Sequence, residues 1–136
     1  MSRPVAAPAL VIGVLALAAV SLALADRGGP AAVSTPYNSI SVTLSEYSIT
    51  PQTISVPGGT VRILVHNSGL LAHNLTIEYE HPNSNGEPTV IASTKTVLPG
   101  KTASVSSQAL SAGRYRMLST ISNEADLGMT GTLIVR

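Results

Sequence analysis

The sequence predicts an all-β protein: a Greek-key β-sandwich or barrel of about eight strands, preceded by one N-terminal hydrophobic helix. Three observations lead to this prediction. Short segments in which apolar and polar residues alternate recur at regular intervals after residue 38. Turn sequences rich in Gly, Pro and Asn separate these segments. No amphipathic helical period follows residue 25, and short strands at such spacing are typical of sandwiches.

The N-terminal helix is predicted from an uncharged, apolar run over residues 5–25 that follows Arg3. Two interpretations fit this run. It is a secretory signal peptide cut after the small-residue pattern that ends at Ala25, or it is an uncleaved membrane anchor of about 20 residues. In both interpretations, the single basic residue before the run keeps the N-terminus on the cytoplasmic side, and the rest of the chain is exported. We therefore expect an exported protein, periplasmic or extracellular, or one anchored to the outer face of the cytoplasmic membrane.

Residues 26–38 are rich in Gly, Pro and small residues and show no periodicity, so they are predicted to be a linker. The domain is then expected over residues 39–136, and this length allows only one. We expect its strands at residues 39–46, 53–56, 60–67, 73–80, 89–96, 102–107, 113–119 and 129–135. The turns between them are expected at residues 57–59, 81–88, 98–101 and 108–112.

Composition narrows the chemistry that the domain can perform. The sequence has no Cys, Phe or Trp, so the core must consist of Val, Ile, Leu, Ala and Tyr. The absence of Cys excludes disulfides, iron–sulfur clusters and thiolate chemistry. Without Arg3 the eight Lys and Arg become seven, equal to the seven Asp and Glu. This neutral balance argues against nucleic acid as a partner, because binding to phosphates needs a basic surface.

One stretch, residues 113–131, has the form of a strand, a loop and the start of a second strand. It completes a series of short motifs through which residues 39–136 resemble the cupredoxins, the small blue-copper sandwiches. More narrowly, the chain is similar to the cupredoxin-like domain of exported iron-transport proteins of the EfeO type. The motifs, in order, are V-P-G-G-T-V before a strand, N-x-G followed by His73-Asn74-Leu75, L-P-G-K-T, G-x-Y, and Gly128-Met129-x-Gly131.

The resemblance implies a copper site made of two His, one Cys and an axial Met. On this pattern the first His corresponds to His73, the Cys to Ser119, the second His to Glu124 and the Met to Met129. Two ligand types are kept and two are lost. A serine hydroxyl is a hard, weak ligand and cannot form the copper–thiolate bond of a blue site.

The resulting hypothesis is an exported or anchored cupredoxin-like binding module that is neither a standard blue-copper electron carrier nor an enzyme. We expect it to hold no cofactor. We expect its partner surface in the apolar loop that begins at Gly69 and ends at Ala72, since exposed apolar patches mark partner sites. An anchor over residues 5–25 would add the membrane as a partner. We expect the remaining His residues, His66 and His81, to be exposed.

Three alternatives stay open at the ligand-equivalent positions. His73 and Met129 could form a weak, non-blue copper site for metal handling outside the cytoplasm. In a purely structural alternative, His73 hydrogen-bonds a loop carbonyl, Met129 fills a gap in the core, and Ser119 and Glu124 bond loop amides. The most distant alternative is a hydrolase in which Ser119, His73 and Glu124 act as nucleophile, base and orienting acid. Met117 is expected in the core.

Overall fold

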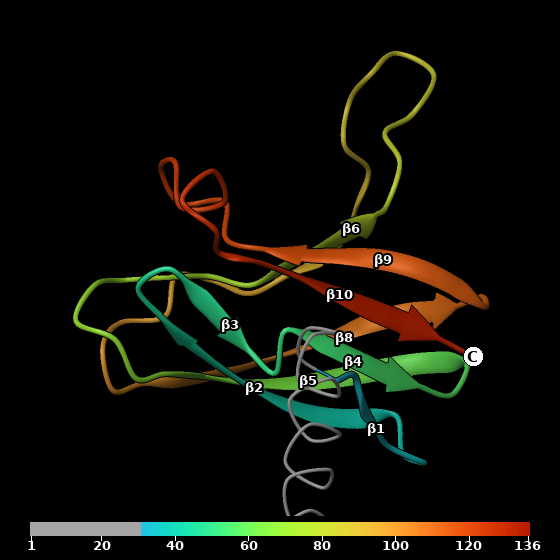
Figure 1. Ribbon diagram of the computed structural model, residues 1–136, viewed down its shortest axis with the longest axis horizontal. Helices are drawn as coiled ribbons and strands as arrows, with labels where there is room; N and C mark the ends of the chain where they lie inside the picture. The colour runs from blue at the N-terminus through green and yellow to red at the C-terminus, as the bar shows by residue number, and fades with distance from the viewer. Residues whose placement is uncertain (1–30) are drawn as a thin grey trace, which may run out of the picture. The chain divides into compact units, whose positions relative to one another are not determined.

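Ten strands in two mixed sheets make up residues 31–136, the part of the chain that the computed structural model describes (Figure 1). In the six-stranded sheet β4 pairs in parallel with β1 and β10, and in the four-stranded sheet β2 pairs in parallel with β5. The other strand pairs are antiparallel. The first sheet has the order β1 (Val33–Ser34), β4 (Thr53–Val56), β10 (Thr130–Val135), β9 (Gly113–Leu118), β6 (Thr76–Tyr79) and β7 (Val90–Ser93). The second has the order β3 (Ser48–Thr50), β2 (Ser39–Ser45), β5 (Gly59–Asn67) and β8 (Thr102–Leu110).

The all-β prediction is confirmed for these residues, and each of the eight expected strands is present in some form. Two short strands were not expected. Strand β3 pairs with β2 directly after a tight turn, and β1 lies within residues 26–38, where the composition predicts a linker. Neither has enough residues to show a clear alternation, which is why sequence periodicity missed them.

Three predicted boundaries are wrong. The strand expected over residues 89–96 ends at Ser93. The strand expected over residues 73–80 begins only at Thr76, because His73 forms no more than an isolated bridge with Val97. The turn expected over residues 108–112 begins later, because β8 continues to Leu110, whose side chain is buried opposite Gly59. The pairing of β5 with β8 has a register shift between Thr60 and Arg62.

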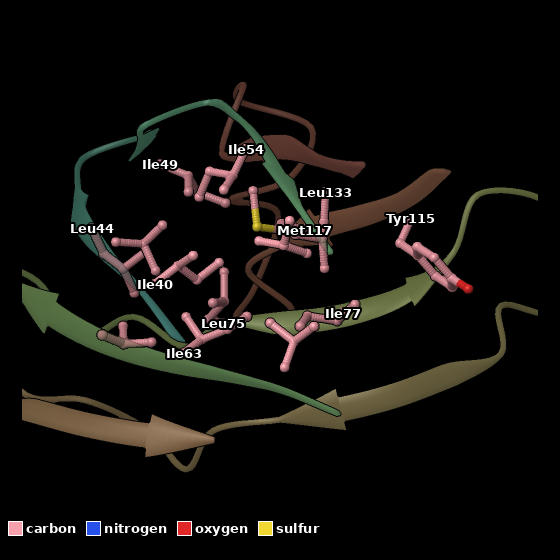
Figure 2. Close-up of a cluster of buried hydrophobic side chains, with 14 of the residues drawn as sticks. Ile40, Leu44, Ile49, Ile54, Ile63, Leu75, Ile77, Tyr115, Met117 and Leu133 are labelled. Carbon is pink, nitrogen blue, oxygen red and sulfur yellow. The ribbon is translucent and has the colours of Figure 1, made fainter. Parts of the chain in front are cut away.

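The core lies between the two sheets and is built from the alternating residues of each strand. Figure 2 shows Ile40, Leu44 and Ile63 of the four-stranded sheet pointing toward side chains of the six-stranded sheet. On β5 every second residue is buried, from Val61 to Val65, whereas Arg62, Leu64 and His66 face solvent, as the sequence predicts. Each fully buried Ile or Leu stabilises the fold by about 1.5–3 kcal/mol relative to an exposed one. Their partners from the opposite sheet are Ile77, Met117 and Leu133.

The N-terminal hydrophobic helix expected over residues 5–25 lies outside the described residues. Within residues 31–136, no helix has the length and hydropathy needed to cross a membrane. The division into an N-terminal segment, a linker and a domain therefore stays a prediction.

Four connections gather at one end of the sandwich: the β2–β3 turn, the β5–β6 loop, the β7–β8 loop and the β9–β10 loop (Figure 1). Asn67, fully buried at the end of β5, ties two of them together. Its Nδ2 donates to the carbonyl oxygens of Leu71 (2.7 Å) and Val97 (2.8 Å), and its Oδ1 accepts from the Gly69 amide (2.8 Å). A single side chain thus fixes the β5–β6 loop against the β7–β8 loop, and this end carries the candidate site.

Candidate functional site

His73 lies in the β5–β6 loop with its side chain fully buried, and both of its ring nitrogens face carboxylates. Nδ1 lies 3.0 Å from both Oε1 and Oε2 of Glu124, and Nε2 lies 2.9 Å from Oε1 of Glu46. The backbone of His73 is held as well, by two hydrogen bonds with Val97. Carboxylate oxygens are acceptors, so one hydrogen must lie between each ring nitrogen and the carboxylate that it faces. Two hydrogens are therefore shared among the three side chains.

Glu124 reaches His73 from the β9–β10 loop. A tight series of turns shapes this loop: the Glu124 amide donates to the carbonyl of Ile121 (3.2 Å), and the Met129 amide donates to the carbonyl of Glu124 (3.0 Å). The Ser119 amide donates in turn to the carbonyl of Met129 (3.3 Å), which closes the loop. These bonds direct the Glu124 carboxylate into the interior, where it is buried.

Ser119, fully buried at the start of the same loop, extends the network. Its hydroxyl lies 2.6 Å from Oε2 of Glu124 and 3.1 Å from Oδ1 of Asn74. A hydroxyl has one hydrogen, so it donates to one of these acceptors at a time. Asn74 also accepts from the Thr120 amide (2.8 Å) and donates from Nδ2 to the Thr120 hydroxyl (2.8 Å). The chain His73, Glu124, Ser119, Asn74 is therefore a continuous buried hydrogen-bond network.

Glu46, which sequence reasoning missed, closes the other side of His73. Its Oε1 accepts from the amides of Leu70 (2.9 Å) and Leu71 (2.8 Å) as well as facing the imidazole. The hydrogen bonds from Leu71 first, then His73 and Leu70, hold the pKa of Glu46 below its ordinary value, outweighing the partial desolvation that opposes them. No local pattern identifies this residue, because it stands 27 positions before its partner.

Gly69, a glycine of the N-x-G motif, packs directly against Glu46. A Cβ at this position would overlap the Glu46 carboxylate group, so only glycine lets the loop approach so closely. Glycine in the N-x-G motif is therefore explained by the carboxylate packed against it.

Met129 is fully buried one residue before β10, and its amide and carbonyl both take part in the loop bonds described above. Its neighbour Gly131 packs against backbone: a Cβ there would lie 2.6 Å from the Gln52 carbonyl oxygen. The G-M-x-G motif thus shapes the entry into β10. The structure brings three of the four ligand-equivalent residues, His73, Ser119 and Glu124, into one network, and Met129 joins it through its backbone.

The hydrolytic arrangement is not formed by these residues. A triad needs the base hydrogen-bonded to the nucleophile, with the acid on the base's other nitrogen. Here Ser119 donates to Glu124 or Asn74, and both nitrogens of His73 face carboxylates. The structural alternative is also only partly correct, since the partners of the His73 ring are carboxylates rather than a loop carbonyl.

A copper ion of the blue type does not fit these residues. The full sequence supplies no thiolate, and both ring nitrogens of His73 are already matched by carboxylate oxygens at hydrogen-bond distance. Across residues 31–136, no group of three or more His, Cys, Asp and Glu side chains is placed to hold a metal ion.

The remaining sequence-predicted side chains lie where they were expected. His66 is exposed on the outer face of β5, and His81 is exposed in the β6–β7 loop. Met117 is fully buried in the core. Neither His contributes to the network around His73.

Comparisons with known proteins agree with this fold. The chain is similar to reduced auracyanin from Roseiflexus castenholzii, at 22% identity over 75% of this chain and 99% of that one, with a TM-score of 0.64. Auracyanin A from Chloroflexus aurantiacus, described as a blue copper protein, is 21% identical over 78% of this chain and all of its own, with a TM-score of 0.60. An azurin from Methylomonas sp. strain J is 20% identical over 76% of this chain and 98% of its own, with a TM-score of 0.59. At these identities the similarity shows the fold alone.

Among curated proteins, none matches the sequence significantly. The sequence pattern described as "Cupredoxin-like domain", in contrast, matches residues 11–135, which is most of the chain. With the two-sheet fold and the ordered motifs, this match leads to one conclusion: the chain belongs to the cupredoxin-like domain family.

Proposed function

We propose that this protein is an exported or membrane-anchored binding module that uses the cupredoxin-like fold without a copper centre. One observation carries the proposal: both ring nitrogens of the buried His73 are matched by carboxylates, from Glu46 and Glu124. In this arrangement hydrogen bonds, rather than a metal, hold the loops together. A protein of this kind presents a preformed surface and does not transfer electrons through copper.

The partner surface that we propose lies at the same end of the sandwich. Leu70, with 87% of its surface exposed, stands at the tip of the β5–β6 loop, beside the half-exposed Leu71. The amides of both residues are fixed by Glu46, so the carboxylate that faces His73 also orients these apolar side chains. The neighbouring loops add Leu98 and Leu127, which are both exposed. An apolar patch held on ordered loops supports a protein partner here.

The metal-free part of the proposal is tested by metal analysis of the full-length chain purified from its native compartment, followed by copper titration with calorimetry and visible spectroscopy. Less than stoichiometric copper and no blue absorption are expected. The alternative, a weak non-blue copper site that uses His73 and Met129, would instead appear as saturable heat that His73→Ala removes.

The partner surface is tested by placing a photo-crosslinking amino acid at Leu70 and, as a matched control, at Val90, which is exposed on β7. A partner that is captured only from Leu70 must then bind the purified full-length chain and fail to bind its Leu70→Asp variant. Equal capture from both positions would count against a specific surface at this end.

A further inference from the structure

The connection between β6 and β7 forms a second candidate site, separate from His73. Figure 1 shows this connection projecting from the end of β6, and two pockets adjoin it. The larger, about 440 Å³, is lined by Tyr79, Glu80, Asn83 and Arg114 among others. The smaller, about 180 Å³, is lined by Glu78, Arg116 and again Tyr79 and Glu80. Because Tyr79 and Glu80 line both pockets, the two pockets form one candidate binding surface.

The segment that borders both pockets is ordered by its own hydrogen bonds. Oδ1 of Asn83 accepts from the amides of Asn85 (2.9 Å) and Glu87 (3.0 Å), and the Asn83 amide donates to the carbonyl of Glu87 (2.8 Å). The base of the segment is closed where the Tyr79 amide donates to the carbonyl of Thr89 (3.1 Å). The walls of the pockets are therefore preformed, which lowers the entropic cost of binding a ligand.

Two cross-strand ion pairs supply the polar groups of this surface. Arg116 on β9 donates to Oε1 of Glu78 on β6 (2.9 Å), and Arg114 donates to Oε1 of Glu80 (3.1 Å). Each guanidinium has five N–H donors and gives one of them to these bonds. Both arginine side chains are about half exposed, and Arg114 lines the larger pocket and Arg116 the smaller, so further donors are accessible to a ligand.

Glu78 is a buried carboxylate with few hydrogen-bond donors around it in the part of the chain that the structure describes. Its side chain is only 5% exposed, yet among residues 31–136 the bond from Arg116 to Oε1 is the one side-chain hydrogen bond found for its carboxylate. A buried carboxylate oxygen without a donor costs free energy, and a ligand hydroxyl in the smaller pocket would supply that donor.

Tyr79 adds an apolar platform. Its ring is 42% exposed and rests on the buried Tyr115, with the ring centroids 5.6 Å apart. The face of a tyrosine ring can pack against the C–H groups of a ligand, while the charged groups beside it contact polar atoms. The surface thus offers acceptors, donors and one aromatic face together.

From these features we infer that the pockets beside the β6–β7 connection bind a neutral saccharide. The charges of Glu78 and Glu80 balance those of Arg114 and Arg116, which disfavours anionic and cationic ligands alike. A sugar hydroxyl donates to a carboxylate and accepts from a guanidinium at once, so each ion pair can serve neighbouring hydroxyls. The C–H face of the sugar ring would lie against Tyr79.

The test uses the full-length chain in detergent, with glucose, mannose, galactose and N-acetylglucosamine as probes. Saturation-transfer NMR and calorimetry measure binding at millimolar sugar, and backbone amide shifts locate it. At least one probe is expected to bind and to shift amides of residues 78–89. Glu78→Gln and Tyr79→Ala should each weaken binding about tenfold or more, since one lost hydrogen bond or contact of this kind is worth about 1.4 kcal/mol.

Tyr37→Ala and Asp126→Asn are the matched controls, because both residues are exposed and neither lines these pockets. Retained binding in the controls with loss in Glu78→Gln and Tyr79→Ala supports the inference. It is overturned if no probe binds the unmodified protein, if the amide shifts map elsewhere, or if binding is unchanged in both site variants. Tighter binding of glucose 6-phosphate than of glucose would overturn the assignment of a neutral sugar as the ligand. If a variant misfolds, the amide shifts of the unmodified chain still show whether a sugar binds at residues 78–89.

Discussion

Nδ1 of His73 lies 3.0 Å from both carboxylate oxygens of Glu124, although 51 residues separate them in the sequence. The pair joins the β5–β6 loop to the β9–β10 loop through a fully buried side chain.

Glu124→Ala should destabilise the protein, because it leaves the buried Nδ1 of His73 without its acceptor, whereas the Ser119 hydroxyl can still donate to Oδ1 of Asn74. We expect a loss of about 1–3 kcal/mol in the free energy of unfolding for the group left unsatisfied. Urea unfolding measures this. Glu87→Ala, at an exposed position, is the control and should change stability by less than about 0.5 kcal/mol. Equal effects from the two variants would mean that the network around His73 contributes nothing.

Gly69→Ala tests the close approach of the β5–β6 loop to Glu46. The new Cβ would overlap the carboxylate, so the Glu46 side chain must move away from Nε2 of His73. NMR should show large shifts for the ring of His73 and the amides of Leu70 and Leu71. Gly58→Ala, where a Cβ would make no contact closer than 3.5 Å, serves as a control for the loss of a glycine between two strands. An unchanged His73 ring in Gly69→Ala would contradict the packing described here.

The pH dependence of stability should contain a contribution from Glu46. Its pKa is lower in the folded protein than the ordinary value near 4.5, so between the two values the unfolded chain binds more protons and stability rises with pH. The contribution is complete above the ordinary value and is lost as the pH falls through the lowered one. The stability difference between the wild type and Glu46→Gln should therefore shrink as the pH falls below about 4.5. A difference that stays constant over this range would refute the assignment.

Restoring the family's ligands should restore its chemistry. In Ser119→Cys combined with Glu124→His, a thiolate and a second imidazole join His73 and Met129, which completes the blue-copper set. The double variant loaded with Cu(II) should absorb strongly in the visible range, whereas Ser119→Cys alone keeps Glu124 against His73 and should stay colourless. A colourless double variant would show that Ser119 and Glu124 do not occupy the ligand positions.

The fold was predictable because it rests on alternation. On β5 the buried Val61, Ile63 and Val65 and the exposed residues between them follow directly from the sequence. The two-residue strand β1 is too short to carry such a pattern, and its pairing with β4 is set by tertiary contacts.

The site was predictable only where a motif marks it. The short motifs locate His73 and Met129, and the ligand pattern implied by the family resemblance points to Ser119 and Glu124. Glu46, in contrast, follows a strand with no signature and meets His73 only after the loops fold. The choice of partners for the His73 ring also depends on three-dimensional distances. Sequence reasoning therefore found Glu124 and missed Glu46. It gave the His73 ring a loop carbonyl as its partner, whereas in the structure the ring faces two glutamates.

Nitrogen-resolved NMR of the His73 ring during copper titration of the metal-free, full-length protein is the most direct test of the central claim. Because both ring nitrogens face carboxylate oxygens at hydrogen-bond distance, we predict no change in either signal up to one equivalent of Cu(I) or Cu(II). Stoichiometric loss or displacement of the Nδ1 signal, with saturable heat, would show that a metal takes the place of Glu124 and would contradict the account.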